Sequence, residues 1–309
     1  MLSLCQGEEV IGVGEYAPMS GIHPHAIEDA LHQVQSFPVS MLSSDLFESM
    51  PQPLGYILSL AHFHASEKKA PKKECPTSIK LAALVEANNV NQAVQLAQGY
   101  LAQGFTCLKI KVGSLSVEEE RQKIKTIAAI GDGNLSLRLD ANKRLTLVQA
   151  IDLVKNLKQI KIEYFEEPLR DIGEAKELHE ATGVDIALDE SFNSMVDLDR
   201  PHLQYLIMKP SRFNSIYQAM NLAQEAMRLG KSVILSHCFE SEHSSALYAL
   251  FIHRLALHER AHGILAEGFF KHGVFASPLR SFRGTLPLTA CYNAIVRAER
   301  AGRGLQRIS

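Results

Sequence analysis

From about residue 78 onward, short apolar runs alternate with longer stretches in which apolar residues recur every three or four positions. The first pattern is typical of β-strands and the second of amphipathic α-helices. Seven runs predict strands: SIKLAALV (78–85), CLKIKV (107–112), LSLRLD (135–140), IEYFEE (162–167), VDIALDE (184–190), YLIMK (205–209) and SVILSH (232–237). The stretches between them, such as NQAVQLAQGYLAQG and VEEERQKIKTIAAIG, predict helices that end at Gly, a frequent residue at helix C-termini. This alternation indicates βα units and a parallel sheet.

The number and spacing of these units favour a barrel over an open sheet. Successive strand runs begin about 20 to 29 residues apart, and a weaker eighth run, GILAEG (263–268), follows the seventh. An open doubly wound sheet more often carries a Gly-rich phosphate loop after its first strand, and the sequence has none. We therefore predict an α/β protein built on a (β/α)7–8 barrel.

The first 75 residues lack this regularity. EEVIGVGEYAP predicts a short strand that enters a Gly- and Pro-rich loop, APMSGIHPH (17–25), and two helical patterns follow. The basic segment EKKAPKKEC (67–75) is interpreted as a solvated linker. We expect an α+β capping domain over residues 1–75, a (β/α) barrel catalytic domain over 76–275, and a C-terminal segment, 276–309, that packs back toward the cap.

Composition and charge exclude several classes of protein. The formal net charge is only −2 over 309 residues, so no overall field favours nucleic acid or an anionic membrane. No run approaches about 18 apolar residues, and the N-terminus lacks a basic region followed by a long apolar core. The five cysteines are scattered without a C-x-x-C pair, which suits a reducing compartment. We expect a cytoplasmic protein with no nucleic-acid or membrane partner.

Polar and ionisable residues recur at one position of the predicted units, the C-terminal end of the strand. They are Lys109 and Lys111 in the second run, Asp140 and Asn142 at the third, Glu166 and Glu167 at the fourth, Asp189 and Glu190 at the fifth, and Lys209 at the sixth. In a barrel these ends gather on one rim, which is where barrel active sites lie. Residues about a hundred positions apart are therefore expected to be neighbours.

Three carboxylates that converge on one rim repel each other unless a cation neutralises them. Hard oxygen ligands without His or Cys point to Mg²⁺, with Mn²⁺ as the alternative, bound with positions open for substrate. Taken singly, each acidic residue can equally be a helix N-cap or first-turn residue, and two lysines on one strand face can mark a solvated edge. Three consecutive acidic strand ends flanked by lysines favour the shared metal site.

The segments KIKVG, LRLDAN, FEEPL, LDES and MKPS, in this order and spacing, resemble the enolase superfamily in its muconate-lactonizing branch, and within it the o-succinylbenzoate synthases. The resemblance covers roughly residues 9 to 275. It implies five site residues: the metal ligands Asp140, Glu166 and Asp189, the acid/base Lys111, and the opposing lysine Lys209. It also implies a capping domain that is N-terminally truncated here, because the segment matching GVGEYAP starts within the first fifteen residues while family members usually open with another strand or two.

The implied reaction is loss of water from a small carboxylate, 2-succinyl-6-hydroxy-2,4-cyclohexadiene-1-carboxylate, in menaquinone synthesis. Its first step removes the proton next to the carboxylate, and Mg²⁺ stabilises the extra negative charge, a pattern known for this superfamily. Lys111 must be uncharged to act, and the Lys109 ammonium and a divalent cation both lower its pKa. Lys111 would then help hydroxide leave as a general acid, while Lys209 stays charged.

Further residues follow from the same resemblance. Substrate-binding or supporting positions are Lys109, Asn142, Glu190, Ser236 and Glu240. The last two belong to LSHCFESEHSSA (235–246), in which His237 and Cys238 stand where Ser is more usual in the family. In the loop 17–25, Met19 and Ile22 are candidates for contact with substrate, against the alternative of a plain surface turn.

Other functions stay open. N-acylamino acid racemases and dipeptide epimerases of the same branch also place one lysine on each side of the reacting carbon. Dipeptide epimerases often carry an acidic motif after the eighth strand, and AEGFF offers only Glu267 without a D-x-D pattern, which favours the synthase. Muconate substrates are a weaker option. From another class, the barrel could be inactive and serve as a binding protein, which the presence of all five catalytic-type residues disfavours.

Overall fold

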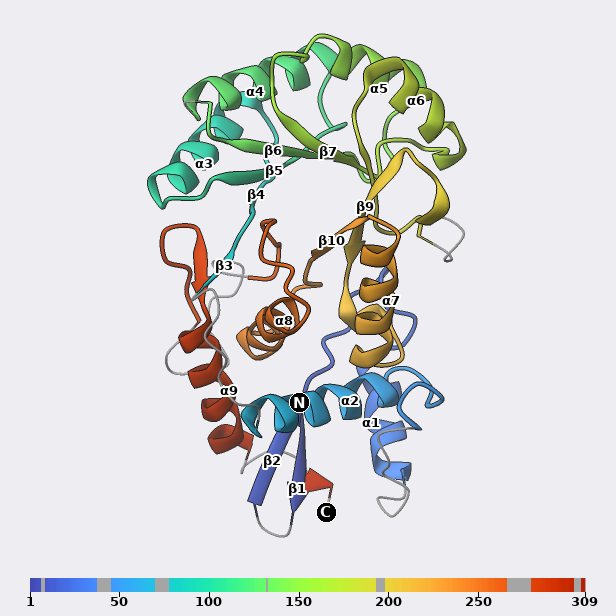
Figure 1. Ribbon diagram of the computed structural model, residues 1–309, viewed down its shortest axis with the longest axis vertical. Coiled ribbons are helices and arrows are strands. Elements are labelled where there is room, and N and C mark those ends of the chain that lie inside the picture. The colour runs from blue at the N-terminus through green and yellow to red at the C-terminus, as the bar shows by residue number, and fades with distance from the viewer. Residues whose placement is uncertain are drawn as a thin grey trace.

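The predicted parallel sheet is present in the computed structural model, which describes residues 1–6, 9–37, 46–69, 78–131, 133–192, 198–265, 279–302 and 307–308. Seven strands hydrogen-bond in the order β10-β9-β8-β7-β6-β5-β4 (Figure 1). They are β4 (Ala83–Val85), β5 (Cys107–Lys111), β6 (Ser136–Asp140), β7 (Ile162–Glu166), β8 (Ile186–Leu188), β9 (Leu203–Met208) and β10 (Ser232–Leu235). Every neighbouring pair is parallel, and each of the seven predicted runs contributes a strand to this sheet. The first run, 78–85, is divided, because only residues 83–85 join the sheet and residues 78–80 form an antiparallel pair elsewhere.

The two edges of this sheet are joined by His262 and Gly263. Gly263 pairs with Ser236, directly after β10, and His262 pairs with Leu81, shortly before β4. This two-residue bridge closes the curled sheet into a barrel at the place where the sequence predicted a weaker eighth strand. The predicted run, 263–268, extends past the last described residue of this segment.

Helices pack along the outer side of the sheet, as the arc from α3 to α6 shows (Figure 1). They are α3 (Val90–Ala102), α4 (Val117–Ile130), α5 (Leu147–Lys155), α6 (Ala175–Thr182), α7 (Ile216–Arg228) and α8 (Glu242–Arg254). Five of them begin after a residue whose side chain accepts a hydrogen bond from a first-turn backbone N–H: Asn89, Ser116, Thr146, Ser215 and Ser241. Within the described ranges, none of the helices combines the length and apolar character needed to cross a lipid bilayer.

Alternate residues of each strand face opposite sides, which separates an apolar outer layer from a mixed interior. On β5, Leu108 and Ile110 are fully buried in the main hydrophobic core, whereas Lys109 and Lys111 lie on the other face. A separate small hydrophobic cluster consists of Tyr164, Ala187, Tyr205, Ile207 and Ile234. The interior of the barrel is therefore apolar in its middle and charged toward the strand ends.

A smaller unit lies at the opposite end of the molecule from β5, β6 and β7 (Figure 1). Its elements are β1 (Leu2–Gln6), β2 (Glu9–Gly14), α1 (Ile27–Ser36), α2 (Leu54–Lys69), α9 (Leu288–Gly302) and β12 (Arg307–Ile308), and a further antiparallel pair is formed by β3 (Ser78–Lys80) and β11 (Thr285–Pro287). β1, which the sequence did not predict, pairs with both β2 and β12. The C-terminal residues thus lie beside the N-terminal strand, while the domain boundaries 1–75, 76–275 and 276–309 stay a prediction.

Two glycines allow β2 to lie directly on α2. A Cβ atom added at Gly12 would lie 2.1 Å from the carbonyl oxygen of Ala61, and one added at Gly14 would lie 2.1 Å from that of Ile57. The GVG segment is therefore a strand–helix contact. It also directs the following loop, residues 15–26, toward the barrel.

Candidate active site

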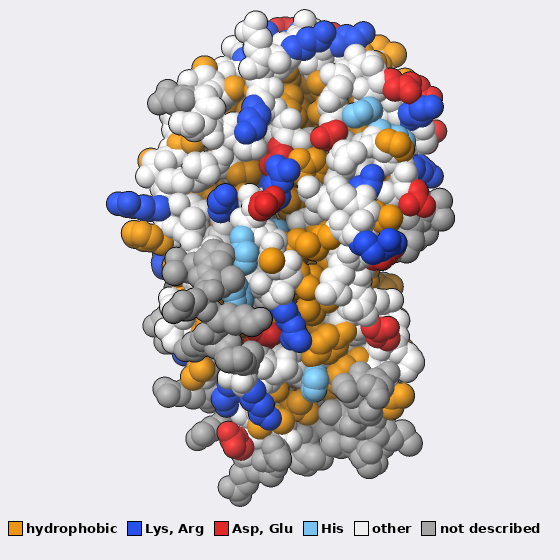
Figure 2. Space-filling view, viewed as in Figure 1, with side chains coloured by type: hydrophobic (Ala, Val, Ile, Leu, Met, Phe, Trp, Pro, Cys, Tyr) orange, Lys and Arg blue, Asp and Glu red, His pale blue; other side chains and the backbone are white. Residues whose placement is uncertain are grey.

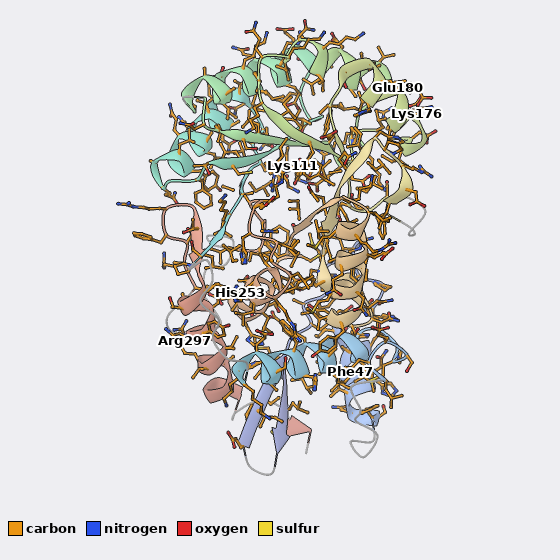
Figure 3. All side chains as sticks on the ribbon, in the orientation of Figure 1. Phe47, Lys111, Lys176, Glu180, His253 and Arg297 are labelled. Atoms are coloured by element: carbon orange, nitrogen blue, oxygen red, sulfur yellow. The ribbon has the colours of Figure 1, made fainter. Side chains whose placement is uncertain are left out.

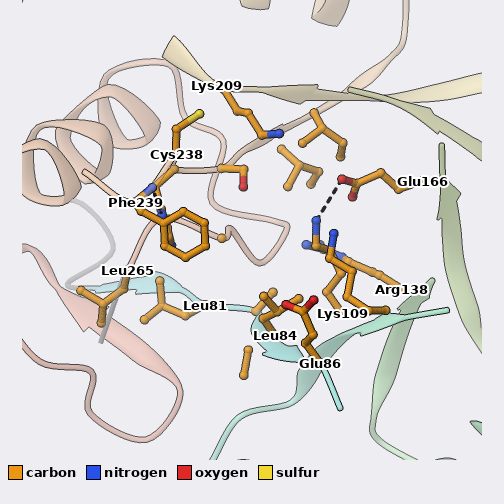
Figure 4. Close-up of a pocket in the computed structure, with 18 of the residues that line it drawn as sticks. Leu81, Leu84, Glu86, Lys109, Arg138, Glu166, Lys209, Cys238, Phe239 and Leu265 are labelled. Atoms are coloured by element: carbon orange, nitrogen blue, oxygen red, sulfur yellow. Dashed lines mark hydrogen bonds and ion pairs between the residues drawn. The ribbon is translucent and has the colours of Figure 1, made fainter. Parts of the chain in front are cut away.

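A cavity of about 390 Å³ lies at the C-terminal ends of the barrel strands (Figure 4). The cap contributes Met19 and Ile22, the two residues named from the sequence of the loop 17–25. Seven of the ten predicted site residues line the cavity: Lys109, Lys111, Asn142, Glu166, Glu190, Lys209 and Ser236. The rest of the wall is largely apolar and includes Leu81, Leu84, Phe239 and Leu265. The cavity therefore has one charged end and apolar sides.

The charged side chains of this site belong to the interior of the barrel. Figure 3 shows Lys111 on the inner side of the sheet, whereas Lys176 and Glu180 lie on the outer helix α6. On the face shown in Figure 2, basic and acidic side chains meet beside hydrophobic ones in the upper half of the molecule. The side chains of Lys109 and Lys111 are 20% and 19% exposed, whereas those of the carboxylates that they contact are 1% exposed. The lysines thus lie between Asp140 and the cavity, whereas Glu166 itself lines the cavity.

The two lysines of β5 share the carboxylates of β6 and β7. Lys109 Nζ donates to Glu166 Oε1 at 2.9 Å and lies 2.8 Å from Asp140 Oδ2. Lys111 Nζ donates to Asp140 Oδ2 at 2.7 Å and to Asn142 Oδ1 at 2.5 Å. The parallel register produces this arrangement, because Lys111 pairs with Asp140 and Asp140 with Glu166 across neighbouring strands. Two lysines on one strand face are thus explained by the acids opposite them.

These contacts favour the charged forms of Lys109 and Asp140. Burial alone would lower the pKa of Lys109, but Glu166 and Asp140 raise it well above its ordinary value. Burial alone would raise the pKa of Asp140, but Lys109 and Lys111 hold it well below its usual range. Lys109 is therefore a firmly charged neighbour of Lys111.

Lys209 and Asp189 form a second charged pair on the other side of the site. Lys209 donates to Asp189 Oδ2, and Arg212 Nη1 lies 3.3 Å from Asp189 Oδ1. Glu167 holds the backbone here, because its carboxylate accepts hydrogen bonds from the N–H groups of Asp189 and Ser191, both at 2.7 Å. Glu167 itself takes a left-handed backbone conformation with φ 39°, which costs energy in a non-Gly residue and is offset by these bonds. The second Glu of FEEP is thus a positioning residue, a role that the sequence did not reveal.

Asn142 and Glu190 connect the lysine side of the site to the fifth predicted strand end. The Asn142 backbone N–H donates to Asp140 Oδ1 at 3.1 Å, and its side-chain Nδ2 donates to Glu190 Oε1 at 3.2 Å. Since Asn142 also accepts from Lys111, it orders three charged side chains around it.

A buried ion pair outside the barrel holds the backbone that carries Lys111. Lys123 Nζ lies 2.5 Å from Glu120 Oε2 and donates to the carbonyl oxygen of Lys111 at 2.8 Å. Glu120 Oε1 accepts hydrogen bonds from the three backbone N–H groups of residues 113–115 at 2.9 to 3.1 Å. Both side chains are at most 2% exposed. The turn after β5 is therefore fixed to α4 through charged groups.

The three carboxylates at the strand ends suit a hard divalent cation. Asp140, Glu166 and Asp189 come from adjacent strands, and Glu166 Oε2 is buried without a hydrogen-bond partner. Burial and the charges of Asp140 and Asp189 raise the pKa of Glu166 to about 8, although Lys109 opposes the shift. In the part of the chain that the structure describes, no three His, Cys, Asp or Glu side chains form a finished metal site. Oxygen-only donors and an unsatisfied buried carboxylate oxygen nevertheless fit Mg²⁺, and these three residues would hold it.

The segment after β10 contributes to the cavity less than the sequence suggested. His237 lines the cavity, its Nδ1 accepts from the Phe239 N–H at 2.8 Å, and burial lowers the pKa of its imidazole to about 4. Glu240 does not line the cavity: it is 1% exposed and accepts hydrogen bonds from the backbone N–H of residue 238 at 2.5 Å and from the Tyr248 hydroxyl at 3.0 Å. Glu240 therefore supports the loop that carries His237, which is the second of the two roles predicted for it.

Glu86 and Arg138 line the cavity and were missed from the sequence. Arg138 precedes Asp140 by two residues on β6, so the alternation that grouped the two lysines of β5 also places Arg138 inside the barrel. Glu86 directly follows β4, the one strand end at which no site residue was proposed. Glu267, considered from the sequence as a residue that grips a substrate amine, lies outside the described residues.

Comparisons with known proteins agree with this geometry. Residues 92–291 match the protein family described as enolase C-terminal domain-like. The Arabidopsis thaliana protein "Protein PHYLLO, chloroplastic" is 26% identical over 206 residues, an alignment that spans 63% of this chain and only 12% of that protein. The o-succinylbenzoate synthase of Citrobacter koseri is 26% identical over 246 residues, which cover 77% of this chain and 73% of that protein.

The fold is also found among solved structures. The substrate-liganded L-Ala-D/L-Glu epimerase from Bacillus subtilis has a TM-score of 0.77 and 19% sequence identity, and the match covers 89% of this chain and 84% of that chain. At this identity the likeness concerns the fold alone. The family match covers most of the barrel, and the acidic strand ends lie between Lys111 and Lys209 as in the resemblance described above. The chain therefore belongs to the enolase superfamily.

Proposed function

We propose that this chain is a metal-dependent enzyme that removes the proton next to a substrate carboxylate and eliminates water, as an o-succinylbenzoate synthase does. The observation that carries the proposal is the placement of Lys111 and Lys209. Lys111 is the last residue of β5, and Lys209 directly follows β9. The three strands between them in the sheet, β6, β7 and β8, end at or directly before the carboxylates of Asp140, Glu166 and Asp189. The similarity to curated o-succinylbenzoate synthases supports the choice of substrate.

Each lysine has a distinct role in the proposed reaction. A bound Mg²⁺ would supply positive charge to the substrate carboxylate as a Lewis acid. Lys111, once deprotonated, accepts the substrate proton at Nζ and then donates it to the leaving hydroxide. Lys109 and Lys209 stay charged, because burial lowers the pKa of each lysine but their carboxylate partners raise it by more. Their charges stabilise the anion that develops on the substrate.

The cavity suits a small carboxylate with an apolar body. Its volume of about 390 Å³ lies within the usual range for small-molecule sites. The charged groups hold one end of the substrate, while Leu81, Leu84 and Phe239 line the sides. A substrate of menaquinone synthesis would place the enzyme in the cytoplasm.

The proposal is tested by the turnover of 2-succinyl-6-hydroxy-2,4-cyclohexadiene-1-carboxylate by purified protein, followed by absorbance with Mg²⁺ and with EDTA. We expect turnover that needs Mg²⁺ and disappears in Lys111→Ala. A wild-type protein that binds Mg²⁺ but leaves this substrate unchanged would contradict the synthase assignment.

Racemisation or epimerisation of amino acid derivatives is a second candidate, and Glu86 favours it. This residue is exposed in the cavity wall, and the ion pairs of the described side chains leave its carboxylate free. A free carboxylate there suits the ammonium group of a dipeptide better than a second substrate carboxylate. Deuterium incorporation from D₂O at the α-carbon of dipeptides or N-succinylamino acids, without dehydration of the cyclohexadiene, would favour this candidate. Binding of Mg²⁺ without exchange on any of these substrates would favour an inactive barrel.

A further inference from the structure

The loop between β2 and α1 reaches the cavity through Met19 and Ile22, and one side chain, His23, joins it to the barrel. His23 is 9% exposed, and its Nδ1 accepts a hydrogen bond from the Met19 backbone N–H at 3.0 Å. Its Nε2 lies 3.0 Å from Ser211 Oγ. Since Nδ1 accepts, the neutral ring carries its proton on Nε2 and donates it to Ser211. His23 therefore fixes the turn of its own loop and binds the barrel with the same ring.

Ser211 lies close to the chemistry of the site. It follows Lys209 by two residues in the short 3-10 turn Pro210–Arg212 and is fully buried. Gln52, from the segment before α2, donates its side-chain Nε2 to the Ser211 carbonyl oxygen at 2.7 Å and to that of Phe213 at 3.0 Å. Two side chains of the cap thus contact the turn that follows Lys209.

The cap also contacts the loop after β10. The buried carboxylate of Glu240 in that loop accepts hydrogen bonds from the backbone N–H of residue 238 and from the Tyr248 hydroxyl. Tyr248 in turn shares a hydrogen bond of 2.6 Å with Tyr56 of α2. Buried polar contacts of the cap therefore reach two neighbouring parts of the barrel: the turn after β9 through His23 and Gln52, and the loop after β10 through Tyr56 and Tyr248.

We infer that His23 is a positioning residue, which through Ser211 holds residues 19–22 against the barrel and so places Met19 and Ile22 at the cavity. The inference rests on geometry: a buried imidazole with both nitrogens engaged, one to its own loop and one to the turn that follows Lys209. The charges around the ring agree with it. Burial lowers the pKa of His23, and Arg212 and Lys209 lower it further, while the ring of Tyr16 packs edge-on at 5.5 Å. A neutral ring is the form that both hydrogen bonds require.

Hydrogen–deuterium exchange of the whole protein tests this without any substrate. The amides of Met19, Ile22 and His23 are hydrogen-bonded within the turn, and loss of the imidazole frees them to open. In His23→Ala we expect exchange of the peptide covering residues 16–25 to accelerate about tenfold, while the β2 peptide stays unchanged. Ser211→Ala removes only the barrel side of the contact and is expected to act in the same direction.

His25→Ala is the matched control, because among the described residues this second histidine of the loop contributes its backbone oxygen, which accepts from the Tyr16 hydroxyl at 2.9 Å, and no side-chain hydrogen bond. Its exchange is expected to match that of the wild type. Unchanged exchange in both His23→Ala and Ser211→Ala, or equal acceleration in His25→Ala, would overturn the inference.

Steady-state kinetics distinguishes a positioning role of His23 from a purely structural one. This part of the test rests on the proposed function. If His23 orders the loop that contacts substrate, His23→Ala raises KM about tenfold and changes kcat by less than about twofold. His23→Gln places an amide near the position of Nε2 and should restore most of KM, whereas His23→Asn mimics Nδ1 and should not. A lower kcat with unchanged KM and a lower unfolding midpoint would instead assign His23 a structural role. Should the cyclohexadiene not react at all, the proposed function fails and the exchange experiment still decides the inference.

Discussion

Glu163 and Glu166 lie three residues apart on β7, have side chains that are 8% and 1% exposed, and behave in opposite ways. Glu163, near the start of the strand, accepts from Arg138 Nε at 2.8 Å, from Ser136 Oγ at 3.1 Å and from Arg260 Nη1 at 3.2 Å. Burial alone would raise its pKa, but Arg138 and Arg260 lower it overall. Glu166, at the end of the strand, has one oxygen bonded to Lys109 and the other without a partner, and its pKa rises to about 8.

Glu163 belongs to an ion pair that stabilises the fold, whereas Glu166 has a buried oxygen without a partner, as expected of a ligand for a cation. At the N-terminal end of the strands two arginines contact one carboxylate, so the negative charge of Glu163 is neutralised within the chain. At the C-terminal end three carboxylates lie close together, and the buried oxygens Glu166 Oε2 and Glu190 Oε2 have no hydrogen-bond partner. A buried carboxylate that lowers stability when it is ionised is expected where binding or catalysis needs the charge.

The largest expected effect is on catalysis at the rim. Lys111→Ala removes the proposed acid/base, and we expect kcat to fall by about 10²- to 10⁴-fold because general acid–base catalysis is lost. Unfolding in denaturant serves as the control, since the change leaves Asp140 with Lys109 as its partner and stability should move little. Retention of more than a tenth of the wild-type kcat would contradict the role of Lys111.

Paired substitutions at the two glutamates sharpen the comparison. Glu163→Gln leaves the guanidinium of Arg138 without its counter-charge, so we expect the free energy of unfolding to fall by about 3 kcal/mol. Glu166→Gln mimics the protonated form that burial already favours, so in metal-free buffer at pH 7 the free energy of unfolding should stay equal or rise. Equal losses in both variants would show that the two carboxylates do not differ as described.

Acid stability is expected to depend on His262 and His243, which lie in the barrel closure and in α8. His262 accepts from the Leu235 N–H at Nδ1 and approaches the Leu257 carbonyl oxygen at Nε2, so only its neutral ring satisfies both contacts. Burial lowers the pKa to about 4 for His262 and about 3 for His243. In the unfolded chain both bind protons below about pH 6.5, so the stabilisation is fully present above that pH and is lost as the pH falls toward the folded pKa values.

The expected loss is about 1.4 kcal/mol per pH unit for each histidine between about pH 6.5 and the folded pKa. Urea titrations from pH 7 to 4.5 measure it. In His262→Gln the slope of unfolding free energy against pH should decrease by about this amount. An unaltered slope in His262→Gln would show that the ring does not stay neutral.

The smallest effect is expected on the surface. Lys176 and Glu180 form an ion pair of 3.7 Å on α6, with side chains 66% and 62% exposed. Lys176→Ala should change the free energy of unfolding by less than about 0.5 kcal/mol, because solvent screens an exposed pair. A loss of unfolding free energy as large as that of Glu163→Gln would contradict the account, because it would mean that burial does not determine how much an ion pair stabilises this protein.

The sequence predicted the barrel and the rim well because both follow from local patterns. Lys109, Lys111 and Asp140 were found because alternate strand residues share a face and strand ends share a rim. Arg138 obeys the same rule and was overlooked. Glu86 was overlooked because the sequence offered no other candidate site residue at the end of its strand.

Other features depend on which distant segments meet, and no local pattern encodes that. His23 and Ser211 are 188 residues apart, and their contact is set by the packing of the cap on the barrel. Glu240 was placed correctly in a polar loop, but its burial against Tyr248 could not be read from LSHCFESEHSSA. The closure through His262 and Gly263 lies at the start of the weak eighth run, GILAEG, which extends past the described residues, and no local pattern showed that it would join Ser236 to Leu81.

Calorimetric titration of Mg²⁺ into wild-type, Glu166→Gln and Glu163→Gln proteins tests the central claim most directly, at a temperature where circular dichroism shows all three to be folded. The account predicts that the wild type and Glu163→Gln bind Mg²⁺ with similar affinity and that Glu166→Gln binds at least about tenfold more weakly. Equal affinity in all three proteins, or no binding by the wild type, would contradict the assignment of the unsatisfied carboxylate of Glu166 to a metal site.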